Sequence, residues 1–238
     1  MDNILYALKT TVTCLIEPHL IKQPKLSVSK KELTAVLHSH FQRVPGEVTK
    51  ALSIASKIHK KQKRNNGEMY LEGHIYPIAE YYLSSRPEPT ITGTVLAIVH
   101  DALEDSNYPD QKNTIKLLSI DVQSEVQKLS KIRLNNKEKQ YKIYVNQLLT
   151  ADEETLVIKT IDIMQNLVTD IDKLKARPLP TEDYNKIAKF VLKVDKNYRL
   201  IFDSIKDYDP KLNKQAYKLL QLANKRVANL SYTYKQKQ

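Results

Sequence analysis

The side chains best able to do chemistry are concentrated in one short segment. His100, Asp101, Glu104 and Asp105 place four ionisable groups within six residues. They follow Val95–Val99, which is apolar on every face of a helix and is therefore expected to be buried. If the helix continues, His100 stacks on Glu104 and Asp101 on Asp105. Burying such groups without a partner is costly, so they need a cation or hydrogen-bonding groups unless this is an ordinary helix end that reaches water.

A second group interrupts a long apolar segment. Asp162 and Asn166 lie four residues apart within the stretch 156–168, so they share one helix face. An acid in the middle of an apolar helix requires a partner. The partner is either a metal or Lys159, which lies close enough for a structural ion pair.

A third feature is a single histidine, His74, at the expected start of a helix after a polar loop that carries Arg64. Alone, such a residue is usually a surface or capping residue. In the segment from His100 to Asp105, imidazole and carboxylate groups occur together, which is the ligand mixture expected for manganese, iron or zinc.

Four residues, in this order, resemble the ligand set of the HD-domain metal-dependent phosphohydrolases: His74, His100, Asp101 and Asp162. That set is a histidine on one helix, a His-Asp pair on a second, and an aspartate on a later helix. Further elements resemble the RelA/SpoT-type guanosine tetraphosphate (alarmone) hydrolases, roughly over residues 48–172. These elements are Ala55, His59, Gln62 and Arg64, then Gly67, Tyr70 and His74, then His100, Asp101, Glu104 and Asp105, and finally Lys159, Asp162 and Asn166.

The resemblance implies a manganese-dependent enzyme of the guanosine-3′,5′-bis(diphosphate) 3′-pyrophosphohydrolase type. Guanosine tetraphosphate or pentaphosphate would give GDP or GTP and pyrophosphate. It implies that Mn²⁺, or another divalent transition metal, is held by His74, His100, Asp101 and Asp162. It further implies that Glu104 and Asp105 orient the attacking water and transfer protons, and that Arg64, Lys159 and Asn166 contact the substrate. His59 is expected to be a core residue or a support for the ligands.

The sequence also departs from this family. Ile75 and Tyr76 separate His74 from Pro77, where the family usually has proline directly after the histidine. Ile163, Met164 and Gln165 replace the family's usual Arg-Leu-His before Asn166. These differences leave open an HD phosphohydrolase for another nucleotide. The chain shows no sign of a synthetase domain and is expected to be a small, hydrolase-only form.

The elements that must position these residues are predicted to be helices. With only 4 Gly in 238 residues, a β protein built on many tight turns is unfavoured, and the predicted fold is all-α. It is expected to be an HD-domain core at 45–176, with an N-terminal helical extension at 1–44 and C-terminal helices at 177–238 packed on the core. Helices are expected near 4–17, 48–61, 75–83, 92–103, 119–133, 136–150, 152–175, 181–206 and 211–230, with a further one that begins at a Ser29–Glu32 capping box.

The composition points to an anionic partner. The formal net charge of +11 favours nucleic acid or a polyphosphate small molecule, and Arg64, Lys61 and Lys63 are expected near the active site. A different class therefore stays open: a basic, helical nucleic-acid-binding protein with a non-functional HD site, which the basic stretch 214–237 would suit. The single cysteine, Cys14, and the lack of a spanning apolar run favour the cytoplasm and no membrane partner. A homo-oligomer is compatible with the sequence.

Overall fold

The protein is built from helices, as predicted. The structure, a computed structural model, describes residues 22–104, 110–175 and 179–235. In these ranges it contains no strand, and the sole extended pairing is an isolated antiparallel bridge between Lys63 and Met69. None of the described helices is long and apolar enough to cross a membrane. The helix expected near residues 4–17 lies outside the described ranges.

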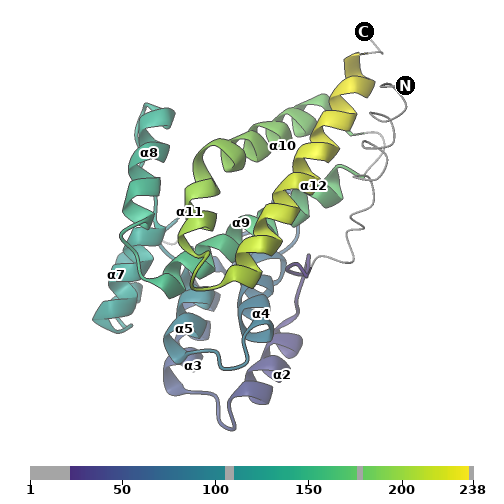
Figure 1. Ribbon diagram of the computed structural model, residues 1–238. Coiled ribbons are helices and arrows are strands. Elements are labelled where there is room, and N and C mark those ends of the chain that lie inside the picture. Colours follow the sequence, from purple (N-terminus) through teal and green to yellow (C-terminus); the bar gives the residue numbers. More distant parts are fainter. Residues whose placement is uncertain (1–21, 105–109, 176–178, 236–238) are drawn as a thin grey trace.

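The helices follow one another through short connections (Figure 1). In chain order they are α2 (Lys30–His40), α3 (Gly46–His59), η2 (Leu71–Ile75), α4 (Tyr76–Ser85), α5 (Ile91–Val99), α6 (Gln111–Ile115), α7 (Ile120–Leu129), α8 (Lys137–Leu148), α9 (Glu153–Lys173), α10 (Thr181–Lys193), η3 (Val194–Tyr198), α11 (Arg199–Ser204) and α12 (Pro210–Lys235). The segments η2 and η3 are single π-helical turns that run directly into α4 and α11. The short helix α6 was not predicted.

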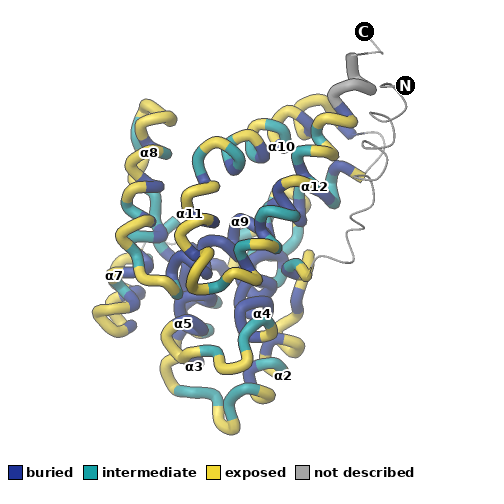
Figure 2. The backbone as a smooth tube through the Cα atoms, in the orientation of Figure 1, coloured by how far each residue is buried: buried dark blue, intermediate teal, exposed yellow. Residues whose placement is uncertain are grey.

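The core lies around α4, α5 and α9, which are the most completely buried helices in Figure 2. The apolar residues of α5 from Val95 to Val99 are all buried, which confirms the prediction for this segment. Helix α5 packs against α3, α4, α7 and α9, and α9 also packs against α11 and α12. Because α9 is covered from several sides, its polar residues Lys159 and Asp162 are buried together with its apolar ones.

Local signals set the beginnings of two helices. Ser29 accepts a hydrogen bond from the backbone of Glu32, whose carboxylate accepts one from the backbone of Ser29 at 2.8 Å, so the predicted capping box is present. Asp152 caps α9 in a similar way, by accepting a 2.7 Å hydrogen bond from the backbone N–H of Thr155.

Several predicted helices are wrong in their extent; for example, the helix expected over 119–133 ends at Leu129. Helix α5 ends at Val99 rather than Leu103, because the hydrogen bonds tighten: Ala102 N–H donates to Val99 O at 2.9 Å, and Glu104 N–H donates to Asp101 O at 3.0 Å. In these turns each hydrogen bond joins residues three apart rather than the four of an α-helix. The predicted α-helical stacking of His100 on Glu104 is therefore wrong. The helix expected over 181–206 is divided into α10, η3 and α11, since the π-helical turn changes its direction (Figure 1).

Candidate metal centre and active-site cavity

Three of the predicted ligands meet where η2 approaches the turn that follows α5. The Nε2 atom of His74 lies 3.1 Å from Oδ2 of Asp101 and 3.4 Å from Nε2 of His100. Nε2 of His100 lies 3.5 Å from the same Asp101 oxygen, and the donor atoms of the three residues all lie within 4.8 Å of one another. All three side chains are buried, so the structure brings together two imidazoles and a carboxylate inside the protein.

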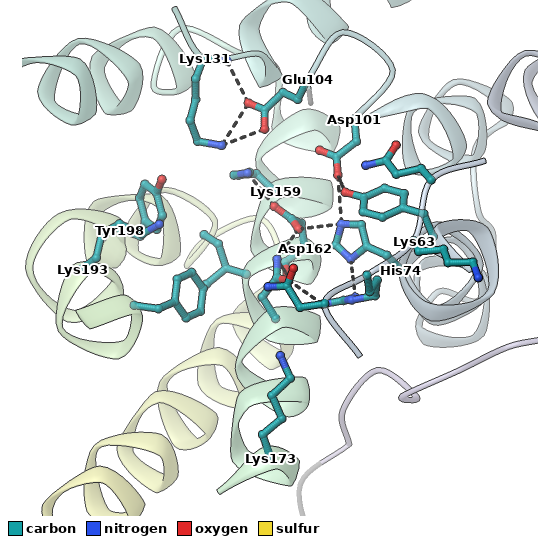
Figure 3. Close-up of a pocket in the computed structure, with 17 residues that line it drawn as sticks. Lys63, His74, Asp101, Glu104, Lys131, Lys159, Asp162, Lys173, Lys193 and Tyr198 are labelled. Atoms are coloured by element: carbon teal, nitrogen blue, oxygen red, sulfur yellow. Dashed lines mark hydrogen bonds and ion pairs between the residues drawn. The ribbon is translucent and has the colours of Figure 1, made fainter. Parts of the chain in front are cut away.

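The fourth predicted ligand reaches this group from α9. Oδ1 of Asp162 lies 3.4 Å from Nε2 of His74, while its other oxygen accepts a 2.6 Å hydrogen bond from Nζ of Lys159. Figure 3 shows His74 between Asp101 and Asp162. The two interpretations of Asp162 therefore both apply: one oxygen is in a structural ion pair and the other faces the cluster. Lys159, predicted to contact substrate, lines the cavity but is engaged by Asp162.

The outer nitrogens of both imidazoles are held by other groups. Nδ1 of His100 donates to Ala97 O at 2.9 Å. Nδ1 of His74 lies 2.9 Å from Oε1 of Gln165, whose amide orientation is set because its Nε2 donates to Gly73 O at 2.9 Å. Nδ1 of His74 also lies 3.1 Å from Nη1 of Arg64. The Nε2 atoms of both histidines face the cluster, where each would offer its lone pair to a bound metal.

The charged groups of the cluster shift one another's pKa values. Burial opposes protonation of His100, but Asp101 and Asp162 outweigh it and raise its pKa to about 9. Burial likewise favours the neutral form of Asp162, but Lys159 and the two histidines outweigh it and lower its pKa to about 2. Burial acts in the same direction on Asp101, where His100 and His74 hold the pKa well below its usual range.

The residues present fit a bound divalent metal. Two carboxylates and two imidazole nitrogens are the donors expected for a first-row transition metal, and two carboxylate charges balance a divalent ion. The outer hydrogen bonds of His74 and His100 are of the kind that fix metal-ligating histidines. His74, His100, Asp101 and Asp162 would hold the ion.

Tyr70 and Gln165 contact the predicted ligands Asp101 and His74. The Tyr70 hydroxyl donates a short hydrogen bond to Oδ2 of Asp101, and its ring stacks on His59 at a centroid distance of 5.1 Å. Sequence reasoning gave Tyr70 no role beyond the motif, and missed Gln165 as the partner of His74. The signal for Gln165 was its position one turn after Asp162 in a buried helix. His59 is fully buried and bonded to Gln62 at 2.7 Å, as expected of a core residue.

The predicted acid–base residue Glu104 lines the cavity and is fixed by Lys131. Its carboxylate accepts from the backbone N–H of Lys131 at 2.9 Å, and from Nζ of Lys131 at 3.0 and 2.9 Å on its two oxygens. Lys131 was not predicted, because it belongs to the connection between α7 and α8, 27 residues further along the chain. The other predicted acid, Asp105, lies outside the described residues.

Arg64 is engaged by the protein itself. Its guanidinium donates to Gly73 O at 2.6 Å, to Gln165 Oε1 at 2.9 Å and to Asn166 Oδ1 at 3.2 Å. Asn166 in turn donates to Oδ1 of Asp162 at 2.8 Å. Arg64 and Asn166 both line the cavity, but their contacts place them beside the ligands, and their predicted contact with substrate stays a prediction.

The cluster forms one wall of a cationic cavity of about 380 Å³. Six basic residues line it: Lys63, Arg64, Lys131, Lys159, Lys173 and Lys193. The expectation of positive charge near the metal residues is thus confirmed for Arg64 and Lys63, while Lys61 is not among the lining residues. Lys173 and Lys193 reach the cavity from α9 and α10 (Figure 3), which the sequence could not place.

Within the described residues, the helical fold brings a histidine, a His-Asp pair and a later aspartate together beside a cationic cavity, which resembles the arrangement expected of the HD-domain phosphohydrolases. The comparisons with known proteins agree. The sequence is 29% identical over 203 residues to the guanosine-3′,5′-bis(diphosphate) 3′-pyrophosphohydrolase of Borreliella burgdorferi, which covers 80% of this chain. The chain spans 28% of the length of that relative.

The fold is similar to a solved structure described as a metazoan ortholog of SpoT that hydrolyzes ppGpp and plays a role in starvation responses. The match has a TM-score of 0.59 and 16% sequence identity, and covers 74% of this chain and 95% of the other. No family model matches the chain. The predicted all-α HD-type fold and the resemblance to guanosine tetraphosphate hydrolases are therefore confirmed.

Proposed function

We propose that the protein is a metal-dependent hydrolase that removes the 3′-pyrophosphate from guanosine tetraphosphate or pentaphosphate, giving GDP or GTP. The observation that carries this proposal is the buried cluster of His74, His100, Asp101 and Asp162 on the wall of a cationic cavity. The activity named for the Borreliella burgdorferi relative supports the choice of substrate. A manganese-class ion and a cytoplasmic location belong to the proposal, supported by the donor set and by the single cysteine.

The proposed reaction breaks the bond between the 3′ oxygen of the ribose and the adjacent phosphorus. Water supplies the new hydroxyl on that phosphorus, and the 3′ oxygen leaves with a proton. A bound divalent ion would supply Lewis-acid chemistry, by polarising a phosphoryl oxygen and making water more acidic. The protein supplies the ligand cage, the cationic walls and a carboxylate beside them.

Glu104 is the described residue best placed to accept a proton from the attacking water. Its carboxylate lies at the cavity wall, three residues after Asp101, and Lys131 restricts its orientation. Lys131 and Lys159 bring positive charge to the same wall, where they would balance the phosphate charge of a substrate. We assign Asp105 to proton transfer on the sequence resemblance.

A pyrophosphate-release assay on guanosine tetraphosphate, with and without manganese, tests the proposal. Wild-type protein should release one pyrophosphate and one GDP per substrate with manganese, and far less in a chelator. A variant with His100→Ala and Asp101→Ala should lose both the activity and the bound metal. Metal-loaded wild-type protein that leaves guanosine tetraphosphate intact would refute the proposed substrate.

A second candidate is phosphohydrolysis of another nucleotide at the same metal centre. Arg64 favours it, because its guanidinium is already bonded to Gly73, Gln165 and Asn166 and is less available to a guanine or phosphate group. The replacement of the family's Arg-Leu-His by Ile163, Met164 and Gln165 points the same way. A panel of nucleoside 5′-monophosphates and triphosphates, assayed with manganese beside guanosine tetraphosphate, separates the two candidates by the substrate with the highest kcat/KM.

A further inference from the structure

A second cavity adjoins the one that contains the metal ligands. It has a volume of about 550 Å³ and lies beside α8 and α10; we call it the distal groove. Its walls carry the ammonium groups of Lys186, Lys189, Lys193 and Lys196 and the rings of Tyr141 and Phe190. Lys193 and Phe190 line both cavities, so the two spaces meet at these side chains.

Lys193 lies at this junction without a carboxylate partner among the residues that the structure describes. Its Nζ instead lies 4.7 Å from the ring centroid of Phe190, 5.0 Å from that of Tyr141 and 5.5 Å from that of Tyr198. The other lysines of the cavity wall differ, since Lys131 is paired with Glu104 and Lys159 with Asp162. Burial, with repulsion from Lys131 and Lys159, lowers the pKa of Lys193 to about 8. An anion beside Nζ would raise this pKa again, because it would favour the charged form of the lysine and offset both burial and the repulsion.

The outer lysines of the distal groove fall into two kinds. Lys186 forms an ion pair with Glu182 at 2.7 Å, and Lys196 lies 3.9 Å from Glu138. Lys189 is exposed and has no ion pair within the described part of the chain. Lys189 and Lys193 are thus the two groove lysines whose charge is not matched by an acid.

We propose that the distal groove binds the 5′-diphosphate of a nucleotide whose 3′-pyrophosphate lies at the metal centre, with Lys193 and Lys189 as the phosphate contacts. The inference rests on the proposed function and extends it to how the far end of the substrate is held. A nucleotide with phosphate groups on both sides of its ribose needs two anion-binding regions, and a single metal centre provides one. The distal groove is a cationic region that is joined to the metal cavity and lies apart from its ligands.

Two substrates that differ only at the 5′ end test this proposal. They are guanosine tetraphosphate and guanosine 3′-diphosphate, assayed on wild-type protein and on a variant with Lys189→Gln and Lys193→Gln. The variant should raise the KM for guanosine tetraphosphate by about 100-fold, since it removes two charge-assisted phosphate contacts and each is worth about tenfold. In the single variant Lys189→Gln, the KM for guanosine 3′-diphosphate should change by less than about twofold, because Lys189 lines only the groove and that substrate does not reach it.

The matched control is a variant with Lys142→Gln and Lys206→Gln. Both residues are exposed, line neither cavity, and change the net charge by the same amount. It should leave the KM of both substrates unchanged. The single variant Lys189→Gln, at an exposed position, keeps the test valid if the double variant unfolds, and should by itself raise the KM for guanosine tetraphosphate alone.

An equal effect on both substrates, or no effect on either, overturns the distal groove as the 5′ site. If wild-type protein releases pyrophosphate from neither substrate, the proposed function has failed, and calorimetric binding of GDP and guanosine then tests the groove separately. The groove predicts tighter binding of GDP than of guanosine, and loss of that preference in the double variant. GDP binding that the double variant leaves intact rejects the groove.

Discussion

At the scale of single residues, His74 is the point on which the proposed metal centre depends. It is the one ligand whose Nε2 is close to each of the other three: 3.1 Å from Asp101, 3.4 Å from His100 and 3.4 Å from Asp162. Its opposite nitrogen, Nδ1, is held by Gln165, which also receives Arg64. The affinity of the centre for metal should therefore depend on a glutamine that is not itself a ligand.

Replacing Gln165 by leucine should weaken manganese binding. Leucine has nearly the same volume but accepts no hydrogen bond, so Nδ1–H of His74 would lose its acceptor and the ring its fixed tautomer. Loss of such a partner typically costs about 10- to 100-fold in metal affinity. Titration of manganese into the chelated protein measures this effect.

The matched control is Gln140→Leu. Gln140 is also a buried glutamine, bonded to the backbone of Leu134 at 2.9 Å, and it does not line the metal cavity. Its replacement should lower stability and leave manganese affinity unchanged. Equal metal affinity in Gln165→Leu and wild-type protein would show that His74 is oriented by other contacts.

Replacing Glu104 by glutamine should separate binding from chemistry. The amide keeps an oxygen for the backbone N–H of Lys131 but cannot accept a proton from water. We expect kcat to fall by about 10²- to 10⁴-fold, the usual range for loss of acid–base assistance, while manganese content stays at the wild-type value. Metal analysis and steady-state kinetics on the same preparation measure both quantities. Loss of metal in Glu104→Gln would make Glu104 a ligand and contradict the division of roles.

The residues that could be predicted from the sequence are those whose type alone is unusual for its surroundings. His100, Asp101 and Asp162 stand next to or within apolar segments, where an ionisable group needs a partner. Gln165 and Lys131 are polar residues without such contrast, and their roles arise from contacts with His74 and Glu104 that are 91 and 27 residues away in the chain. Those contacts depend on tertiary packing, which no local pattern specifies.

At the scale of elements, the apolar pattern of α5 predicts that the helix is buried but does not predict where it ends. The uninterrupted apolar run of Val95–Val99 predicts burial on all sides, and this is confirmed. The end of the helix could not be predicted in the same way, because the change to three-residue turns after Val99 occurs where His100 and Asp101 turn toward His74. The proposed metal ligands His100 and Asp101 thus occupy the tight turns beyond the helix, rather than the helix itself.

Close packing at the start of α5 leads to a prediction for Gly93. A methyl group there would lie 2.0 Å from the hydroxyl oxygen of Tyr82 and 2.6 Å from a carboxylate oxygen of Glu154. Tyr82 is fully buried and cannot move aside freely. Gly93→Ala should therefore lower the free energy of unfolding by about 1–3 kcal/mol, as overpacking does.

Gly46 provides the contrast, since a methyl group there meets nothing within 4 Å at the beginning of α3. Gly46→Ala should leave stability unchanged or raise it by up to about 1 kcal/mol. Urea unfolding of both variants measures the difference. Similar stabilities for the two alanine variants would mean that α4 and α5 do not approach as closely as the structure shows.

At the scale of the whole molecule, the proposed metal centre joins parts of the chain that are distant in sequence. His74 comes from η2, His100 and Asp101 from the turn after α5, and Asp162 from the middle of α9. The connection that carries Lys131 and the helix that carries Lys193 close the cavity from the other side (Figure 3). The formal charge of +11 in the sequence predicted an anionic partner, but its concentration at this cavity follows only from the fold.

Because the ligands come together only in the folded chain, metal should stabilise the whole molecule. A ligand that binds only the folded state, at a concentration 100-fold above its Kd, adds about 2.7 kcal/mol to the free energy of unfolding. For a protein of this size that corresponds to a rise in Tm of about 5–10 °C. Thermal unfolding with manganese and with a chelator should show this difference in Tm. The difference should shrink at acidic pH, because the ligands bind metal in their deprotonated forms.

The variant with His100→Ala and Asp101→Ala should show no rise in Tm with manganese. The matched control, His38→Ala with Asp121→Ala, changes the same residue types at exposed positions and should retain the rise. An equal rise in Tm for the two double variants would mean that manganese stabilises the fold from a site other than this cluster.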